Sequence, residues 1–225
     1  MELVKEDFTL GNNIRTKRLS KECSEVILSV ANSLWKVNTA TFPGPQPISI
    51  ERKHFSMLKS EQYSVGDKND GERYCLVFIN YNGSDIAALF NRGCIGHLVS
   101  LKASKRLYEG TIIDGELMDG KFIAFDCPLY GGLDIHKKSF SHRMGHIDMC
   151  VKCFKRFPEN MVVVKKQFVP LDSISMLIRG DKSDGLVFMP EEPPVSTITN
   201  PKMFKWKPNK LNTIDFGIKG KKVYL

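Results

Sequence analysis

Residues 66–73 read Gly-Asp-Lys-Asn-Asp-Gly-Glu-Arg, and no other stretch of the chain says as much about its fold. The Lys-x-Asp-Gly-x-Arg core sets the amine of Lys68 beside the carboxylate of Asp70, a turn glycine and the guanidinium of Arg73. This combination is typical of a nucleophile with supporting charges, because an amine can accept a transferable group that its neighbours help to hold. The alternative is a solvated charged turn, since Asp-Gly is a common turn dipeptide.

Further motifs stand before and after Lys68. They are Phe-Pro-Gly-Pro-Gln-Pro-Ile-Ser-Ile at 42–50, a helix-like run at 51–59, Thr-Ile-Ile-Asp-Gly-Glu-Leu at 111–117, Phe-Asp-Cys at 125–127, Ser-Asp-Gly-Leu-Val-Phe at 183–188, Phe-Lys-Trp-Lys-Pro at 204–208 and Asn-Thr-Ile-Asp-Phe at 212–216. As an ordered set they resemble the covalent nucleotidyltransferases, the superfamily of polynucleotide ligases and mRNA capping enzymes. The first motif and the last two are similar to those of GTP:RNA guanylyltransferases rather than DNA ligases. The resemblance covers about residues 42–218.

The resemblance implies an mRNA guanylyltransferase that works through a covalent intermediate. Lys68 would take GMP from GTP as a lysyl-GMP adduct and pass it to the 5′-diphosphate end of RNA, which forms a cap. GTP and RNA are the implied partners, with RNA triphosphatase and cap methyltransferase activities in the same chain or a partner chain. A divalent cation, Mg²⁺ or Mn²⁺, is the implied cofactor.

The resemblance also assigns roles to other side chains. The implied nucleotide-binding residues are Asp70, Arg73 at the ribose or phosphate, Arg92 at a phosphate, Glu116 at the ribose, Phe125 stacked on guanine, Lys166 at the base, Asp184 with the metal, and Lys205 and Lys207 at the α-phosphate. Asp184 and Glu116 are the implied metal ligands. Each residue type has a structural alternative, since acidic residues beside glycines often only form turns, strand aromatics are often core, and surface cations are often solvated.

A lysine that attacks the α-phosphate of a nucleoside triphosphate has to be neutral. The side chain is protonated at neutral pH unless burial or nearby cations favour its neutral form. Lys205, Lys207, Arg73 and a bound metal would supply such charges, and the same cations would screen the phosphates that the nucleophile approaches.

Composition agrees with a globular protein that handles a polyanion. With 225 residues, of which 42% are hydrophobic, the chain can bury a core in one large or two small domains. The formal net charge of +8 favours a polyanionic partner. There is no apolar run of about 18 residues, so we expect no membrane span, and nothing near Met1 resembles a secretion signal. We therefore expect an intracellular protein, in the nucleus, the cytoplasm or a viral replication site, with six free cysteines.

The hydrophobic pattern predicts an α+β fold. Because the motifs of the resemblance interleave with its strands, we expect a helical lead-in at residues 1–41 and one catalytic domain at 42–225. Residues 23–36 have helical spacing, with Ser20 as the N-cap. Apolar runs separated by Asn-Gly, Arg-Gly and Asp-Gly pairs predict an antiparallel meander at 75–79, 86–90, 95–101, 111–118 and 121–125. We also expect helices at 141–154 and 172–179, and later strands at 161–164, 186–188, 202–206 and 214–218. The resemblance implies the ligase and capping-enzyme fold, ATP-grasp-like, with antiparallel sheets and flanking helices.

One stretch has the residue types of a zinc site: His142, His146, Cys150 and Cys153. On one helix, the 11 residues from His142 to Cys153 would separate these side chains by about 16 Å, too far for a single ion. We therefore favour an amphipathic helix, whose inward residues would be Met144, Ile147, Val151 and Phe154.

The last motif of the family, Arg-x-Asp-Lys, belongs to an OB-fold lid that follows the Lys-Trp-Lys-Pro segment. Only 17 residues follow Pro208, so we expect this chain to lack the lid and to form the adduct slowly by itself. Residues 179–182 match the string but precede the Ser-Asp-Gly-Leu motif, and we interpret them as a charged turn. So compact a version of this enzyme would suit a large DNA virus.

Two other functions remain open at this point. An ATP-dependent RNA or DNA ligase domain would share the nucleophile and the acidic motifs but would take ATP. A catalytically idle RNA-binding module of the same fold would bind RNA with a steep salt dependence and never carry a covalent nucleotide.

Overall fold

The computed structural model describes residues 4–11, 14–154, 161–192, 195–211, 217–219 and 222–224. The elements, in chain order, are β1 (Val4–Leu10), β2 (Ile14–Leu19), α1 (Lys21–Ser33), β3 (Gln46–Ser49), η1 (Arg52–His54), α2 (Phe55–Ser60), β4 (Tyr63–Asn69), β5 (Glu72–Tyr81), β6 (Ser84–Asn91), β7 (Gly96–Val99), α3 (Lys105–Tyr108), β8 (Thr111–Met118), β9 (Lys121–Tyr130), β10 (Leu133–Asp134), α4 (Phe140–Cys153), β11 (Val162–Lys165), β12 (Phe168–Pro170), η2 (Leu171–Met176), β13 (Ser183–Pro190), β14 (Thr199–Trp206), η3 (Asn209–Leu211), β15 (Gly217–Lys219) and β16 (Lys222–Tyr224). The α+β class is confirmed.

The larger of the two main sheets has nine strands within the described residues, in the order β1-β2-β7-β6-β5-β8-β9-β10, with β11 on β9. All pairs are antiparallel except β11 with β9. The β5–β6 hairpin turns at Asn82 and Gly83, whose φ angles of 50° and 79° are those of the mirror-image turns that suit twisted strands. The predicted meander holds only for β5, β6 and β7, because β8 returns to the other side of β5.

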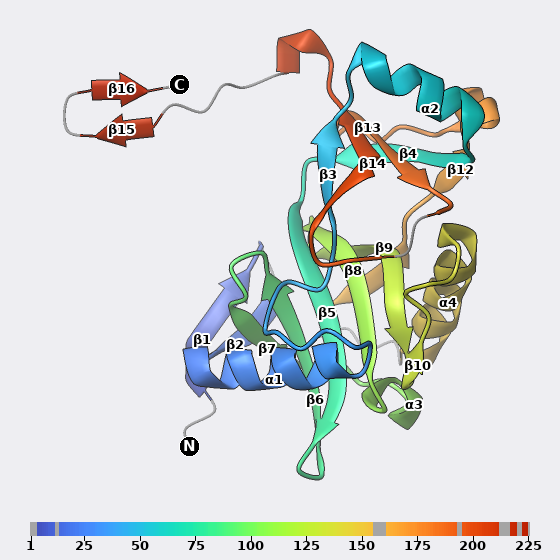
Figure 1. Cartoon of the computed structure of the whole chain (residues 1–225). Helices are drawn as coiled ribbons and strands as arrows, with labels where there is room; N and C mark the ends of the chain where they lie inside the picture. Colours follow the sequence, from blue (N-terminus) through green and yellow to red (C-terminus); the bar gives the residue numbers. More distant parts are fainter. Residues whose placement is uncertain are drawn as a thin grey trace.

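Helices cover both faces of this sheet, and the alternation of side chains along β5 shows which helix covers which face. Val77 and Ile79 share a buried cluster with Ile27 and Leu28 of α1. Leu76 and its alternate neighbours instead share a cluster with residues of α4. Each fully buried side chain of this size contributes about 1.5–3 kcal/mol relative to exposure. The helix α1 crosses in front of these strands in Figure 1.

The predicted N-cap of α1 is confirmed, because the Cys23 amide donates to Ser20 Oγ at 3.1 Å. The predicted helix at 141–154 is also confirmed, and its buried residues include Met144, Ile147 and Cys150. Among the residues that the structure describes, no cluster of His, Cys, Asp and Glu side chains could hold a metal ion, and all six cysteines are free thiols.

The smaller sheet has the order β12-β4-β13-β14-β3, and only β14 and β3 run parallel. Its own apolar cluster contains Tyr63, Val65, Phe188 and Phe204. Strand β4 ends at Asn69 and β5 begins at Glu72, so two residues carry the chain from the small sheet to the large one. Lys68 therefore lies where the two sheets meet (Figure 1).

Several predictions need correction. Residues 4–10 and 14–19 are not helical lead-in but strands at the edge of the large sheet, joined to it through β7. The predicted helix at 172–179 is the 3-10 helix η2. Asp114 and Gly115 do not break a strand but lie inside β8. The predicted strand at 214–218 lies partly outside the described residues, and the motif at 212–216 lies entirely outside them.

Candidate active site

Lys68 is the second-last residue of β4, close to the junction of the two sheets. At this point β4 pairs with β13. Lys68 and Gly185 are register partners, which brings the Asp184 carboxylate beside the amine. Lys68 Nζ donates to Asp184 Oδ1 at 2.9 Å and to Oδ2 at 3.2 Å. The Lys68 side chain is 19% exposed, so the amine is sheltered but still open to a substrate.

A second lysine completes this cluster. Lys207 Nζ lies 2.5 Å from Asp184 Oδ2. Partial burial would raise the pKa of Asp184, but hydrogen bonds from Lys207 and Lys68 outweigh burial and lower the pKa below its ordinary value. The carboxylate is therefore ionised at neutral pH and holds two ammonium groups at the mouth of the site.

A cavity of about 210 Å³ opens between the sheets next to Lys68. Seven of the predicted site residues line it: Lys68, Arg73, Arg92, Glu116, Phe125, Lys166 and Lys205. These residues are spread over five strands and two connections, so only the folded chain brings them together. Strand β14 contributes Lys205, opposite Val187 of β13.

Glu116 and Lys166 form the ion pair of the inner wall. Lys166 Nζ donates to Glu116 Oε2 at 3.3 Å, and the Lys166 side chain is only 5% exposed. Burial lowers the pKa of Lys166 and outweighs the opposing effect of Glu116. Lys166 Nζ also lies 5.5 Å from the centre of the Phe125 ring, as in a cation–π contact.

Arg73 is held in place by protein groups on three of its nitrogens. Nε and Nη2 donate to Asp114 at 3.0 and 2.5 Å, and Nη1 donates to the Pro45 carbonyl at 2.7 Å. Burial disfavours the Arg73 charge, but Asp114 more than offsets burial and raises the pKa of Arg73. A Cβ at Gly44 would lie 2.3 Å from Asp114 Oδ2, so glycine is required where the Phe-Pro-Gly motif crosses this pair.

Gly115 has a similar steric role. A Cβ on this residue would lie 2.5 Å from the Phe122 ring and 2.8 Å from the Ile123 carbonyl oxygen. The Asp-Gly-Glu motif therefore uses glycine for close packing of β8 on β9, and its acidic residues are not turn formers.

The remaining predicted residues lie outside the cavity. Asp70 is exposed in the β4–β5 connection, where its amide donates to the Lys182 carbonyl at 3.1 Å. Asp184 contacts Lys68, which lines the cavity, and Lys207 contacts Asp184, as described above. The nucleotide contacts assigned to all of these residues stay predictions.

The segment at 179–182 lies away from the cavity. Arg179 Nε lies 3.3 Å from Asp67 Oδ1, and the Gly180 amide donates to Asp67 Oδ2 at 2.8 Å. Because successive residues of a strand point to opposite faces, Asp67 faces away from Lys68. The charged-turn interpretation of this segment agrees with its contacts.

Sequence reasoning missed the neutral walls of the cavity. They are formed by Gln46, Pro47, Phe168, Val187, Met189 and Met203. In the sequence these residues look like ordinary strand or core positions. A usable signal was position, because five of these six residues lie within or directly beside the quoted motifs: Gln46, Pro47, Val187, Met189 and Met203.

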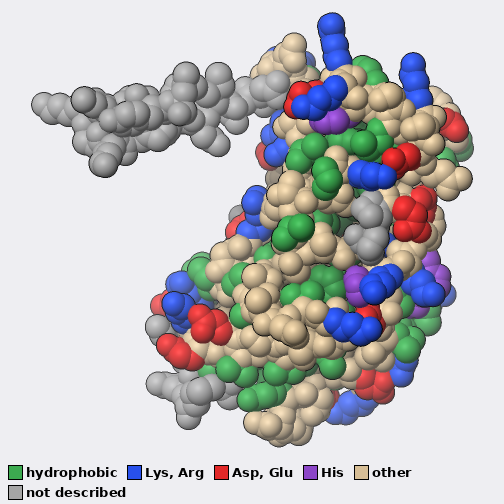
Figure 2. All heavy atoms as spheres, viewed as in Figure 1, with side chains coloured by type: hydrophobic (Ala, Val, Ile, Leu, Met, Phe, Trp, Pro, Cys, Tyr) green, Lys and Arg blue, Asp and Glu red, His purple; other side chains and the backbone are tan. Residues whose placement is uncertain are grey.

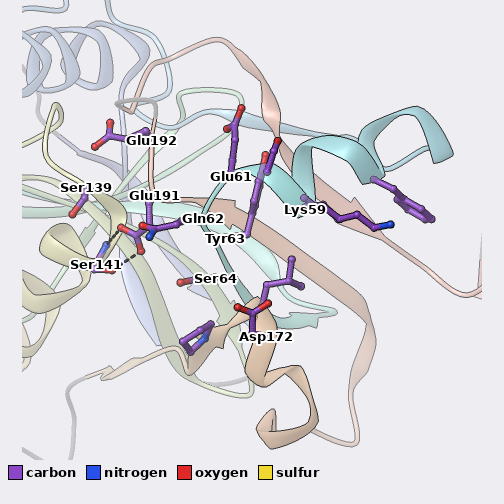
Figure 3. Close-up of a pocket in the computed structure, with 15 residues that line it drawn as sticks. Lys59, Glu61, Gln62, Tyr63, Ser64, Ser139, Ser141, Asp172, Glu191 and Glu192 are labelled. Carbon is purple, nitrogen blue, oxygen red and sulfur yellow. Dashed lines mark hydrogen bonds between the residues drawn. The ribbon is translucent and has the colours of Figure 1, made fainter.

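A larger cavity, of about 1190 Å³, lies elsewhere and contains none of the predicted site residues. It is lined by residues of α2, the start of β4, the start of α4, the start of η2 and the two residues after β13. Figure 3 shows Glu191 hydrogen-bonded to Ser141 on its wall. Its size alone does not make it the active site, because it offers carboxylates but no candidate nucleophile beside supporting cations. We therefore place the candidate active site in the smaller cavity.

The carboxylates at the site fit a divalent ion that arrives with its substrate. Carboxylate oxygens are ligands that Mg²⁺ and Mn²⁺ prefer. Mg²⁺ is commonly held by one or two carboxylates together with substrate phosphates, and does not need a protein cage. Both predicted metal ligands already pair with lysines: Asp184 pairs with Lys68 and Lys207, and Glu116 pairs with the buried Lys166.

Comparison with known proteins gives the family. The family described as mRNA capping enzyme, catalytic domain, matches residues 9–209. The chain is 28% identical over 216 residues to the mRNA-capping enzyme subunit alpha of Schizosaccharomyces pombe, which covers 80% of this chain and 54% of that protein. It is 29% identical over 223 residues to the mRNA-capping enzyme of Caenorhabditis elegans, which covers 84% of this chain and 35% of that protein. The chain thus spans about half, or less, of the length of these relatives.

Among solved structures, similar chains come from DNA ligases. A Lig E DNA ligase has 16% identity and a TM-score of 0.45, over 73% of this chain and 68% of the ligase. A mycobacterial DNA ligase D complexed with ATP and MES has 12% identity and a TM-score of 0.46, over 72% of this chain and 60% of the ligase.

Proposed function

Because the chain belongs to the mRNA capping enzyme catalytic-domain family, we propose that it is a GTP:RNA guanylyltransferase with Lys68 as the nucleophile. The observation that carries this proposal is the placement of Lys68 at a cavity that it shares with six other residues predicted for the nucleotide site. If residues 66–73 were only a solvated charged turn, Lys68 would not be expected to share a cavity with these residues.

In the first step, the Lys68 amine loses its proton to water and attacks the α-phosphorus of GTP. A phosphorus–nitrogen bond forms while the bond from the α-phosphorus to its bridging oxygen breaks, and pyrophosphate leaves with the electron pair. Lys205 and Lys207 neutralise charge near the α-phosphate, because phosphoryl transfer depends on positioning and on charge neutralisation. Phosphates would draw Lys207 from Asp184 toward the substrate.

In the second step, a terminal oxygen of the RNA 5′-diphosphate attacks the same phosphorus. The phosphorus–nitrogen bond breaks, Lys68 recovers a proton, and GMP is joined to the RNA as a cap. The net charge of +8 would draw the RNA to the protein through a diffuse field. Figure 2 shows Lys and Arg side chains spread over one face among acidic ones, rather than gathered in one patch.

The base would occupy the inner part of the cavity. Phe125 offers an aromatic surface, and Lys166 offers a buried donor beside it. The apolar walls from Val187 and Met203 would exclude water from the base. Arg92, in the turn after β6, is exposed and would meet a phosphate at the cavity entrance.

We propose Mg²⁺ or Mn²⁺ as the cofactor, held by Asp184 together with the triphosphate. When bound, the ion would shield the charge of the phosphates. We also propose that RNA triphosphatase and cap methyltransferase activities act beside this chain, and that it works inside the cell. Among the described residues, no helix is both long and apolar enough to cross a membrane.

Covalent labelling tests the proposal. Protein incubated with α-labelled GTP and a divalent ion should carry label through denaturation, and ATP should label it far less. Lys68→Ala should abolish the label, and Lys68→Arg should too, because a guanidinium does not present a neutral nitrogen at neutral pH. Lys21→Ala is the matched control, since this lysine is 83% exposed on α1.

Three outcomes would contradict the proposal. Equal labelling from ATP would indicate a ligase-type nucleotide specificity. Label that persists in Lys68→Ala would remove the nucleophile. RNA binding with a steep salt dependence and no label from either nucleotide would indicate an idle binding module.

A further inference from the structure

Phe125 is the extra residue of a β-bulge. Strands β8 and β9 pair Asp114 with Asp126 and then Gly115 with Ala124, so the register passes over Phe125. A bulge changes the direction of a side chain relative to the regular pleat, and bulges are frequent beside active sites. The Phe125 ring consequently lines the cavity near two cations, with the Arg73 guanidinium 5.4 Å and Lys166 Nζ 5.5 Å from its centre.

The residue after the bulge is fixed by a buried ion pair. Arg143 Nε donates to Asp126 Oδ1 at 2.7 Å, and Nη2 donates to Oδ2 at 3.0 Å. Both side chains are at most 3% exposed. Asp126 Oδ1 also accepts the amide of Cys127 at 2.7 Å. One carboxylate thus ties the backbone just beyond the bulge to the guanidinium.

Arg143 is itself anchored away from the strand. It belongs to α4, whose N-cap Ser139 accepts the His142 amide, and its Nη1 donates to the Lys138 carbonyl. The ring of Phe140 lies 5.8 Å from the guanidinium. The helix therefore presents Arg143 in a set orientation, and the bulge of β9 has to conform to it.

A buried ion pair is a weak source of net stability, because desolvation offsets much of the attraction. Its geometric effect is stronger, since a bidentate contact between Arg and a carboxylate fixes both distance and plane. No regular strand pairing sets the conformation at residue 125, because the bulge leaves that residue without a register partner. The Arg143–Asp126 ion pair supplies a conformational constraint at the bulge that the pairing of β8 and β9 does not.

We propose that Arg143 is a positioning residue for the nucleotide base: by holding Asp126, it fixes the bulge that sets Phe125 in the cavity. This inference rests on the proposed function, because it takes Phe125 as the surface on which the base of GTP stacks. Arg143 would act on GTP affinity rather than on the transfer step, since Lys68 and Asp184 belong to β4 and β13.

The first experiment measures adduct formation as a function of GTP concentration. In Arg143→Lys, which keeps the charge but loses the bidentate fork, the KM for GTP should rise roughly tenfold, as expected for an impaired stacking contact, while the saturating rate stays within about twofold. Arg18→Lys is the matched control, because it makes the same substitution in an exposed ion pair, with Glu6, on β1 and β2 at the other edge of the large sheet. If Arg143→Lys leaves the KM for GTP unchanged and only lowers the fraction of protein that forms the adduct, the role of Arg143 is merely structural. That result would overturn the proposal.

A double-mutant cycle with Phe125→Leu sharpens this test. If Arg143 acts through Phe125, Arg143→Lys should change the KM little in a protein that already carries Phe125→Leu. Additive effects would overturn the proposal. Should Arg143→Lys fail to fold, the paired change Asp126→Asn with Arg143→Gln leaves no unpaired charge and should show the same rise in KM.

Hydrogen exchange provides an arm that needs no nucleotide. The Cys127 amide should exchange faster in Arg143→Lys than in the parent protein, while amides of β4 and β13 keep their rates. Unchanged exchange at Cys127 would overturn the proposal even if labelling works. If the parent protein never labels with GTP, the proposed function fails, and this arm still shows whether Arg143 fixes the bulge.

Discussion

Two of the ion-pair clusters beside the cavity differ in exposure and in geometry. Arg73 and Asp114 form a bidentate pair whose side chains are 12% and 1% exposed. Lys68 and Lys207 share Asp184 at the mouth, with side chains 19%, 31% and 13% exposed. A buried guanidinium fork is fixed, whereas partly exposed ammonium groups can exchange one carboxylate for a phosphate. The first cluster therefore builds the wall, and the second can take part in the reaction.

The largest effect should come from breaking the fixed pair. Asp114→Asn leaves the Arg73 charge buried without its carboxylate, which should reduce the free energy of unfolding by about 3–5 kcal/mol. Urea denaturation measures this change. Asp119→Asn is the control, because its ion pair with Lys182 is exposed and should contribute only about 0–1 kcal/mol. Equal stabilities for the two variants would mean that Arg73 and Asp114 do not differ from a surface pair.

The second effect concerns the exchangeable cluster. Asp184→Asn keeps the shape of the side chain but removes its charge, so adduct formation should fall by about 100-fold while the protein stays folded. Labelling at saturating GTP, with circular dichroism as the folding control, measures both properties. Normal labelling at low Mg²⁺ would show that the Asp184 charge does not serve the reaction.

The neutral wall should give a smaller effect on GTP affinity. Val187→Ala removes two methyl groups from the cavity, which at about 0.8 kcal/mol per buried carbon should raise the KM for GTP roughly tenfold. Val169→Ala is the matched control, since Val169 lies on β12 and is not among the cavity residues. A similar KM in the two variants would place the base elsewhere.

The smallest effect is the pH dependence of stability at Asp184. Partial burial acts to raise the pKa of Asp184, but Lys207 and Lys68 outweigh burial and lower this pKa below its ordinary value. A lowered folded-state pKa stabilises the protein above the unfolded pKa of about 3.9, and this contribution is lost as the pH falls through the folded pKa. The stability difference between the parent protein and Asp184→Asn should be full near neutral pH and shrink below about pH 4. A stability difference that grows as the pH falls would contradict this prediction.

The sequence by itself determined the fold class, the family resemblance and most of the cavity residues. Short apolar runs and Asn-Gly or Asp-Gly turns predicted β5, β6 and the first half of β9, because these signals act over a few residues. The motif at 66–73 likewise singled out Lys68, which the structure places at the cavity, and its role as nucleophile stays a prediction.

Only the tertiary structure decided which charges meet. The partners Asp114 for Arg73, Asp184 for Lys68 and Asp126 for Arg143 lie 41, 116 and 17 residues away. The lead-in was wrongly predicted as helical because β1 and β2 become strands by pairing with each other and with β7, far along the chain. Val187 and Met203 looked like core residues because burial against a cavity and burial against protein produce the same local pattern. Strand pairing and buried charge depend on distant neighbours, and a local pattern does not contain them.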